Sequence, residues 1–163
     1  MTPRVRWLND LIRLEIMLWD HVDARLKREH DLPLSSFETL LALEDGEPRR
    51  IGDLAGVLRI TVGGASKLAD RVRAAGLIDR AADPGDRRAS LIALTPHGRA
   101  SLAAATVTYD AAVAEMLDGV LNDDEQRSMH EMVRRLLAET TQRSHSWSTH
   151  SRGVTSFGTG GTP

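Results

Sequence analysis

One stretch constrains the fold more than any other: residues 83–98, with the sequence DPGDRRASLIALTPHG. Its Pro-Gly turn lies between two short aliphatic runs, residues 77–78 and 91–94, and this arrangement is typical of a β-hairpin. Two adjacent arginines, Arg87 and Arg88, follow the turn. Thr95 and Pro96 then predict the start of a helix, because threonine caps helices and proline is tolerated in the first helical turn. We therefore expect a hairpin that carries arginines at its tip and leads into a helix.

Two short helices are predicted immediately before this hairpin. Residues 50–58 place aliphatic side chains at helical spacing, and Thr61 is a suitable N-cap for a second helix that runs to about Ala75. Gly76 is typical of the residue that follows a helix. Helix, turn, helix and hairpin together predict a winged helix-turn-helix with a two-stranded β-wing, in a mainly α (α+β) chain.

Longer helices flank this unit on both sides. Residues 4–29 carry an apolar stripe that is wider than one packing face needs, which favours a second subunit as a packing partner over core on both sides. After the break at residues 30–33, Ser35 or Ser36 is expected to cap a short helix, with Glu38 completing a capping box. Helices over about 96–119 and from 122 onward follow, the latter starting with the capping box of Asn122 and Glu125.

These patterns predict the domain organisation. We expect one winged-helix domain over residues 4–140, with the DNA-binding lobe at 49–98. In residues 141–163, 14 of 23 residues are Ser, Thr or Gly and none is acidic, which predicts a flexible tail. The histidines within that tail lack other ligand types nearby, so no metal site is expected there.

Composition excludes several classes of protein. The chain has no cysteine, which excludes disulfides, thiol redox sensing and cysteine-bound zinc. We find no apolar run of membrane-spanning length and no signal peptide, so a cytoplasmic protein that does not engage membranes is expected. The chain contains no Gly-rich phosphate loop after a strand, and its histidines are scattered over separate helices. We therefore expect no enzyme, no cofactor and no metal.

The charge distribution favours a nucleic-acid partner. Residues 49–99 contain ten Lys or Arg and five Asp or Glu, a local balance of +5, while the whole chain has a net charge of −2. The remainder therefore carries −7, which indicates a basic face on an acidic body.

Candidate DNA-binding residues lie on the second helix of the pair and on the wing. Placed in the major groove, the helix would offer hydroxyls, cations and closely approaching backbone: the candidates are Thr61, Gly63, Gly64, Ser66, Lys67 and Arg71. Arg87 and Arg88 would enter the adjacent minor groove, and Asp86 would orient the wing by holding one of them. The alternatives are a frayed first helical turn at the glycines and a solvated hairpin tip at the arginines.

Three segments resemble the MarR family of bacterial transcriptional regulators: RIGDLAGVL, ITVGGASKLADRVRAAGLIDR and DPGDRRASLIALTPHG. The most specific element is the wing, from Asp86-Arg87-Arg88 to Leu94-Thr95 and Gly98. The resemblance covers about residues 8–138.

This resemblance implies a homodimer of winged-helix subunits, in which the helices at 4–30 and 96–140 form the dimerisation region. The dimer is expected to bind double-stranded DNA at a pseudo-palindromic operator, commonly as a repressor. It also implies that a small aromatic or phenolic ligand enters a cleft beside the DNA-binding lobe and releases the DNA. The aromatic and histidine residues Trp19, His21 and Phe37, with Trp7 and Tyr109, are the candidates for lining that cleft. The competing hypothesis is a winged helix that contacts proteins and binds no operator.

Overall fold

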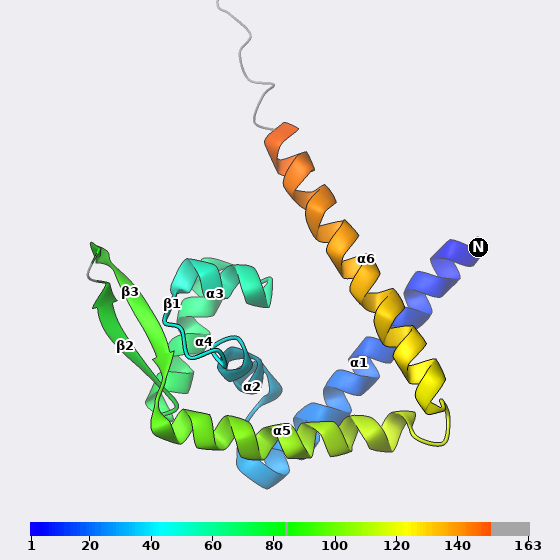
Figure 1. Ribbon diagram of the computed structural model, residues 1–163, viewed down its shortest axis with the longest axis horizontal. Helices are drawn as coiled ribbons and strands as arrows, with labels where there is room; N and C mark the ends of the chain where they lie inside the picture. Colours follow the sequence, from blue (N-terminus) through cyan, green and yellow to red (C-terminus); the bar gives the residue numbers. More distant parts are fainter. Residues whose placement is uncertain (84, 151–163) are drawn as a thin grey trace, which may run out of the picture. The chain divides into compact units, whose positions relative to one another are not determined.

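The computed structural model describes the backbone of residues 1–83 and 85–150, and the side chains of these residues except 87, 88 and 141–150. It confirms the predicted mainly helical architecture (Figure 1). The elements, in chain order, are α1 (Pro3–His30), α2 (Leu34–Leu41), β1 (Arg49–Arg50), α3 (Ile51–Leu58), α4 (Val62–Ala74), β2 (Ile78–Asp83), β3 (Asp86–Leu94), α5 (Pro96–Leu117) and α6 (Asp123–His150). They form two compact units, residues 1–116 and residues from 117 onward, which are described separately below.

The wing is a β-hairpin with a third strand added. β2 and β3 pair antiparallel with Ile78 opposite Leu94, and β1 pairs antiparallel with the other edge of β3, so the strand order is β1-β3-β2. The predicted two-stranded wing is therefore present, but the sequence did not indicate β1. β1 consists of two arginines, a sequence without the aliphatic pattern of a strand. It is a strand because its backbone pairs with β3, with Arg49 opposite Ile92.

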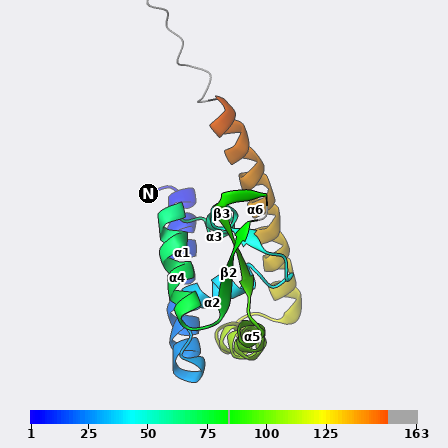
Figure 2. The same cartoon turned by 90° about the vertical axis from the view of Figure 1, so that its left-hand side faces the viewer.

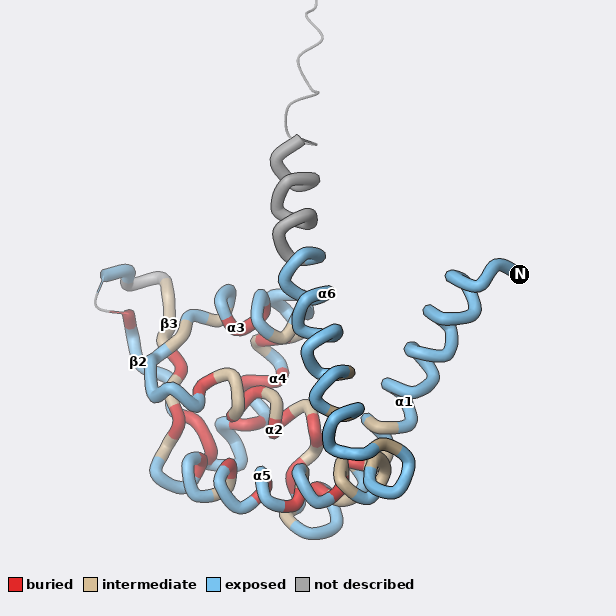
Figure 3. The backbone as a smooth tube through the Cα atoms, turned by 45° about the vertical axis from the view of Figure 1, so that its right-hand side comes forward, coloured by how far each residue is buried: buried red, intermediate tan, exposed pale blue. Residues whose placement is uncertain are grey.

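The core of the first unit draws one or more side chains from each surrounding element. Leu26 of α1, Leu40 of α2, Leu54 of α3, Val72 of α4 and Ile92 of β3 are all at most 1 % exposed. Figure 3 shows these buried segments gathered around α2, α4 and the base of the hairpin, whereas the N-terminal part of α1 extends away from them with its surface exposed. The core thus holds α4 and the wing on one scaffold.

Three of the helix caps agree with the sequence-based expectation. The hydroxyls of Thr61 and Thr95 each accept the backbone N–H three residues later, at 3.1 and 2.9 Å. Asn122 and Glu125 cap α6 reciprocally: Oδ1 of Asn122 accepts the Glu125 N–H at 3.0 Å, and Oε2 of Glu125 accepts the Asn122 N–H at 2.8 Å. These contacts satisfy N–H groups that have no partner within the helix.

The predicted capping box of α2 is wrong. The helix begins at Leu34, so Ser35 and Ser36 lie inside it, and Ser36 is 3 % exposed. The first N–H group of α2 is instead accepted by the carboxylate Oδ1 of Asp23 on α1, at 2.8 Å. A side chain from another helix therefore performs the capping that the sequence pattern assigned to a local serine.

The last helix is longer than predicted. α6 continues to His150, so residues 141–150, which were expected to belong to the tail, are helical. The remainder of the predicted tail, residues 151–163, lies outside the described residues. Among the helices that are described, none combines the length and apolar character needed to span a membrane.

Candidate nucleic-acid interface

α4 presents one buried and one exposed face. Ala65, Leu68, Ala69 and Val72 are buried against the core, while the opposite side of the helix is exposed. Three of the predicted DNA-binding residues fall on that opposite side at a spacing of four, which aligns them along the helix: they are Gly63, Lys67 and Arg71. Of the other three, Thr61 is exposed at the N-terminus, and Gly64 and Ser66 are half-buried.

The two glycines of α4 have different structural surroundings. A Cβ at position 64 would lie 3.2 Å from Oγ1 of Thr61, so Gly64 leaves room for the capping hydroxyl. A Cβ at position 63 would meet nothing within 4 Å. Glycine inside a helix costs roughly 1 kcal/mol relative to alanine, and nothing in the described part of the chain requires it at position 63. The exposed side of α4 at Gly63 is therefore open to a close approach from outside.

α4 and the wing are held together. α4 packs against β2, and the hairpin projects beyond the core, as the two views in Figures 1 and 2 show. Across this junction, Nη1 of Arg80 on β2 lies 3.5 Å from Oδ1 of Asp70 on α4. Arg87 and Arg88 occupy the start of β3, next to the turn, and their side chains are outside the described residues.

The turn at the tip of the wing is organised around Asp83, which is 8 % exposed. Its Oδ1 accepts the Gly85 N–H at 2.8 Å, and its Oδ2 accepts Nε of Arg50 at 2.8 Å with Nη2 at 2.5 Å. The Gly85 N–H and the Arg50 guanidinium hold the pKa of the Asp83 carboxyl below its usual value. The orienting role expected for Asp86 stays a prediction, and the contacts of Asp83 were not predicted from the sequence.

A local signal for Asp83 was available. An aspartate two residues before a glycine commonly accepts that residue's N–H and forms a turn. The contribution of Arg50 had no such signal, because it lies 33 residues away and reaches Asp83 only through the pairing of β1 with β3. Val62 was not among the predicted site residues. It is 56 % exposed in the first turn of α4, and an apolar side chain there is of the kind that contacts a thymine methyl group.

The residues predicted to line an effector cleft do not come together in one place. Trp19 borders a cavity, whereas Phe37 is 2 % exposed and stacks on Tyr109 with ring centroids 5.1 Å apart. His21 lies on α1 with its Nε2 3.4 Å from Oε2 of Glu115.

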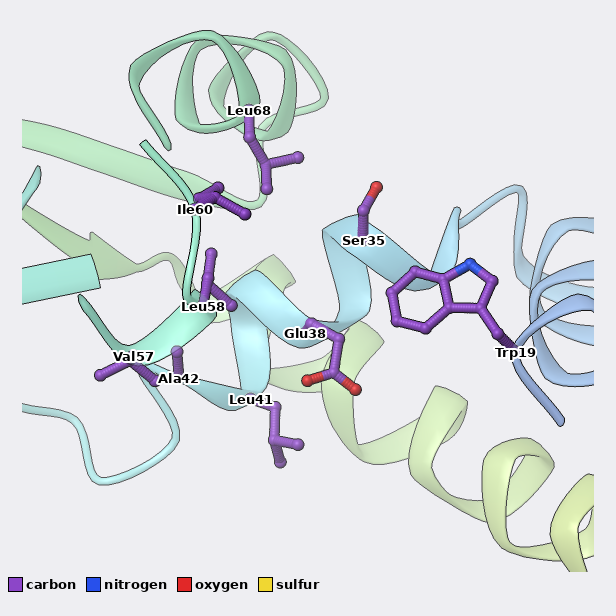
Figure 4. A pocket seen from close by; sticks show the side chains of 9 residues that line it. All are labelled: Trp19, Ser35, Glu38, Leu41, Ala42, Val57, Leu58, Ile60 and Leu68. Carbon is purple, nitrogen blue, oxygen red and sulfur yellow. The ribbon is translucent and has the colours of Figure 1, made fainter. Parts of the chain in front are cut away.

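The cavity that Trp19 borders has a volume of about 340 Å³ and is shown in Figure 4. It is lined by Trp19, Ser35, Glu38, Leu41, Ala42, Val57, Leu58, Ile60 and Leu68. Within the described residues, no three His, Cys, Asp or Glu side chains are placed to hold a metal ion.

The sequence of this chain is similar to that of known proteins. The model of the MarR family matches residues 30–89. An uncharacterised HTH-type transcriptional regulator from Bacillus cereus is 28 % identical over 130 residues, which cover 77 % of this chain and 86 % of the relative.

Solved structures show the same fold over nearly their whole length. The transcriptional regulator BldR from Sulfolobus solfataricus superposes with a TM-score of 0.75 at 26 % identity, covering 85 % of this chain and 99 % of that one. Sco3205 from Streptomyces coelicolor, a MarR family transcriptional regulator solved in complex with DNA, gives 0.74 at 25 % identity, covering 86 % and 89 %. The transcriptional repressor CouR, bound to a 23-mer DNA duplex, gives 0.72 at 24 % identity, covering 78 % and 89 %.

Proposed function

Because this chain belongs to the MarR family of winged helix-turn-helix, DNA-binding transcriptional regulators, we propose that it is a cytoplasmic, homodimeric repressor. It binds a pseudo-palindromic operator and releases it when a small aromatic or phenolic effector binds. One observation carries this proposal. Within the lobe formed by residues 49–98, α4 exposes Lys67 and Arg71 beside a wing whose sequence contains two arginines.

In the proposed complex, the N-terminal half of α4 lies in the major groove. Lys67 and Arg71 neutralise phosphates, while Thr61 and Ser66 donate to phosphate oxygens or base edges. Arg87 and Arg88 enter the adjacent minor groove from the wing, where narrow A·T-rich segments attract arginine. The Asp70–Arg80 contact supports this geometry because it joins the wing to α4. The Asp83–Arg50 pair joins the turn of the wing to β1, directly before α3.

The homodimer is supported by the exposed apolar side chains of the terminal helices. Large exposed apolar sets mark protein–protein contacts, since each such side chain contributes about 1.5–3 kcal/mol when it is buried. Trp19 borders the cavity; the other large apolar side chains of α1 that are at least 40 % exposed are Val5, Trp7, Leu8, Leu11, Ile12, Leu14, Ile16 and Met17. On α6, Met132, Val133, Leu136 and Leu137 are similarly exposed. We propose that a second copy of the chain covers them, with residues 4–30 and 96–140 as the dimerisation region.

Arg88→Ala tests operator binding. We expect it to weaken affinity for a duplex from the upstream intergenic region by about 1–3 kcal/mol, because a charge-assisted contact in the groove is lost. If Arg88 neutralises one phosphate, the slope of log K against log salt becomes shallower by about 0.9. Fluorescence anisotropy at several salt concentrations measures both quantities. Arg28→Ala removes the same charge from an exposed residue of α1 that lies beyond its exposed apolar side chains at 5–19, and it is the matched control. It should leave the sedimentation of the protein and both quantities unchanged.

The alternative, a winged helix that binds only proteins, has a distinct outcome in the same titration. In that case the wild-type chain would bind no duplex with dependence on sequence or salt, and Arg88→Ala would change nothing.

Gly63→Ala separates the stability of α4 from its proposed contact with DNA. The added methyl group has open space, so the free protein should gain up to about 1 kcal/mol of stability from improved helix propensity. Operator affinity should nevertheless fall at least fivefold, since the methyl group would stand between the helix backbone and the duplex. Urea denaturation and anisotropy measure the two effects. A stabilised variant that binds DNA as well as the wild type would show that Gly63 does not approach the duplex.

A further inference from the structure

The cavity beside Trp19 contains one charged group. Glu38 of α2 is the charged side chain among its nine lining residues, and seven of the others are apolar. Among the described residues that line the cavity there is no lysine, arginine or histidine, so the charge they contribute is that of one carboxylate. In the view of Figure 4 the Glu38 carboxyl lies between the Trp19 indole and the aliphatic side chains of Ala42 and Val57.

Glu38 is half-buried and lacks a compensating charge within the described part of the chain. No ion pair or side-chain hydrogen bond reaches its carboxylate there, unlike Asp23 and Glu29 on α1, which are paired with basic side chains. Burial raises the pKa of Glu38, as expected for a carboxyl removed from water without a partner. Burial, and then the charge of Glu38, raises the pKa of the nearby Tyr109 phenol.

Three of the large apolar side chains that line the cavity are exposed to solvent. Trp19, Val57 and Ile60 are 41 %, 54 % and 42 % exposed, although each borders the same hollow. The volume of about 340 Å³ is at the lower end of the range for small-molecule sites. An occupant with an apolar body would cover these side chains.

We infer that the effector of this cavity is a small organic cation with an apolar body, whose positive charge is held by Glu38 and the face of Trp19. This inference rests on the proposed function, because it names the chemistry of the ligand that function requires. A cation supplies the missing counter-charge, and an indole face attracts cations through its quadrupole. An anion would place a second negative charge beside Glu38, where the described lining residues include no basic group.

Isothermal calorimetry on the full chain with three matched probes tests the charge. The probes are benzyltrimethylammonium, its neutral carbon analogue neopentylbenzene, and the anion phenylacetate, none of which changes charge near neutral pH. We expect benzyltrimethylammonium to bind at least tenfold more tightly than the neutral analogue, and phenylacetate to bind more weakly than both. Glu38→Gln, which keeps the shape of the side chain, should weaken benzyltrimethylammonium binding at least tenfold and change neopentylbenzene binding less than twofold. Glu47→Gln removes an equal charge from the exposed loop before β1 and should change neither.

Several results would overturn the inference. They are phenylacetate or uncharged phenol binding as tightly as benzyltrimethylammonium, an undiminished affinity of the cation for Glu38→Gln, and the absence of any cation binding at millimolar concentration. Operator binding is measured separately, without ligand. A chain that binds the operator but not the cation contradicts this inference alone, whereas a chain that binds the cation but no duplex contradicts the proposed function.

Discussion

Replacing Gly98 with alanine is expected to lower the free energy of unfolding by about 3 kcal/mol, the upper part of the usual range for overpacking a core. A Cβ at this buried position would lie 1.9 Å from the carbonyl oxygen of Leu77 and 2.9 Å from its carbonyl carbon. That carbonyl oxygen cannot move freely, because it accepts hydrogen bonds from the N–H and the hydroxyl of Thr95, both at 3.1 Å. The methyl group would therefore force apart the junction between the hairpin and α5.

Urea denaturation at one fixed protein concentration measures this effect, since the stability of an oligomer depends on concentration. Gly56→Ala on α3 is the matched control: it adds the same methyl group where nothing lies within 4 Å, and it should be neutral or stabilising. A Gly98→Ala variant within 0.5 kcal/mol of the wild type would show that the backbone at Leu77 yields easily.

Leu8→Glu is expected to convert the proposed dimer into a monomer and, with it, to abolish tight operator binding. Leu8 is 50 % exposed on α1, and Ile12, one turn further along, is 47 % exposed, so both belong to the apolar surface assigned to the second copy. A glutamate buried there would lose its hydration without gaining a partner. We expect at least a 100-fold rise in the dimer dissociation constant, which corresponds to about 2.7 kcal/mol.

Operator affinity is expected to fall because the monomer lacks the second DNA-binding lobe. A dimer engages two half-sites at once, whereas a monomer has only one winged helix and forfeits the high effective concentration of the other. Sedimentation and anisotropy measure the two effects. Asn9→Glu introduces the same charge at the neighbouring exposed polar position and should leave the dimer intact. If Leu8→Glu still sediments as the wild type does, this part of α1 is not the subunit contact.

The helix caps show which parts of the fold could be predicted from neighbouring residues. Thr61, Thr95 and Asn122 each bond an N–H or a side chain three residues away, so the spacing alone contains the contact. The apolar periodicity of α4 likewise placed Lys67 and Arg71 on the exposed side, as the structure has them. The wing followed from a turn between two aliphatic runs.

Other features depend on residues that are far apart in the chain. Asp23 caps α2 from α1, Arg50 holds Asp83 across the sheet, and Gly98 is required by the carbonyl of Leu77. No local pattern contains these contacts, because they arise only when packing brings separate elements together.

The same distinction applies to the functional site. Contacts between neighbouring residues were sufficient to predict a winged helix in which α4 exposes basic side chains, since turns, caps and helical faces are set within a few residues. Only the tertiary structure placed Glu38 and Trp19, from different helices, around one cavity and left Phe37 in the core. Burial is a property of the packed chain, and it decides which aromatic side chain is accessible from outside and which supports the fold.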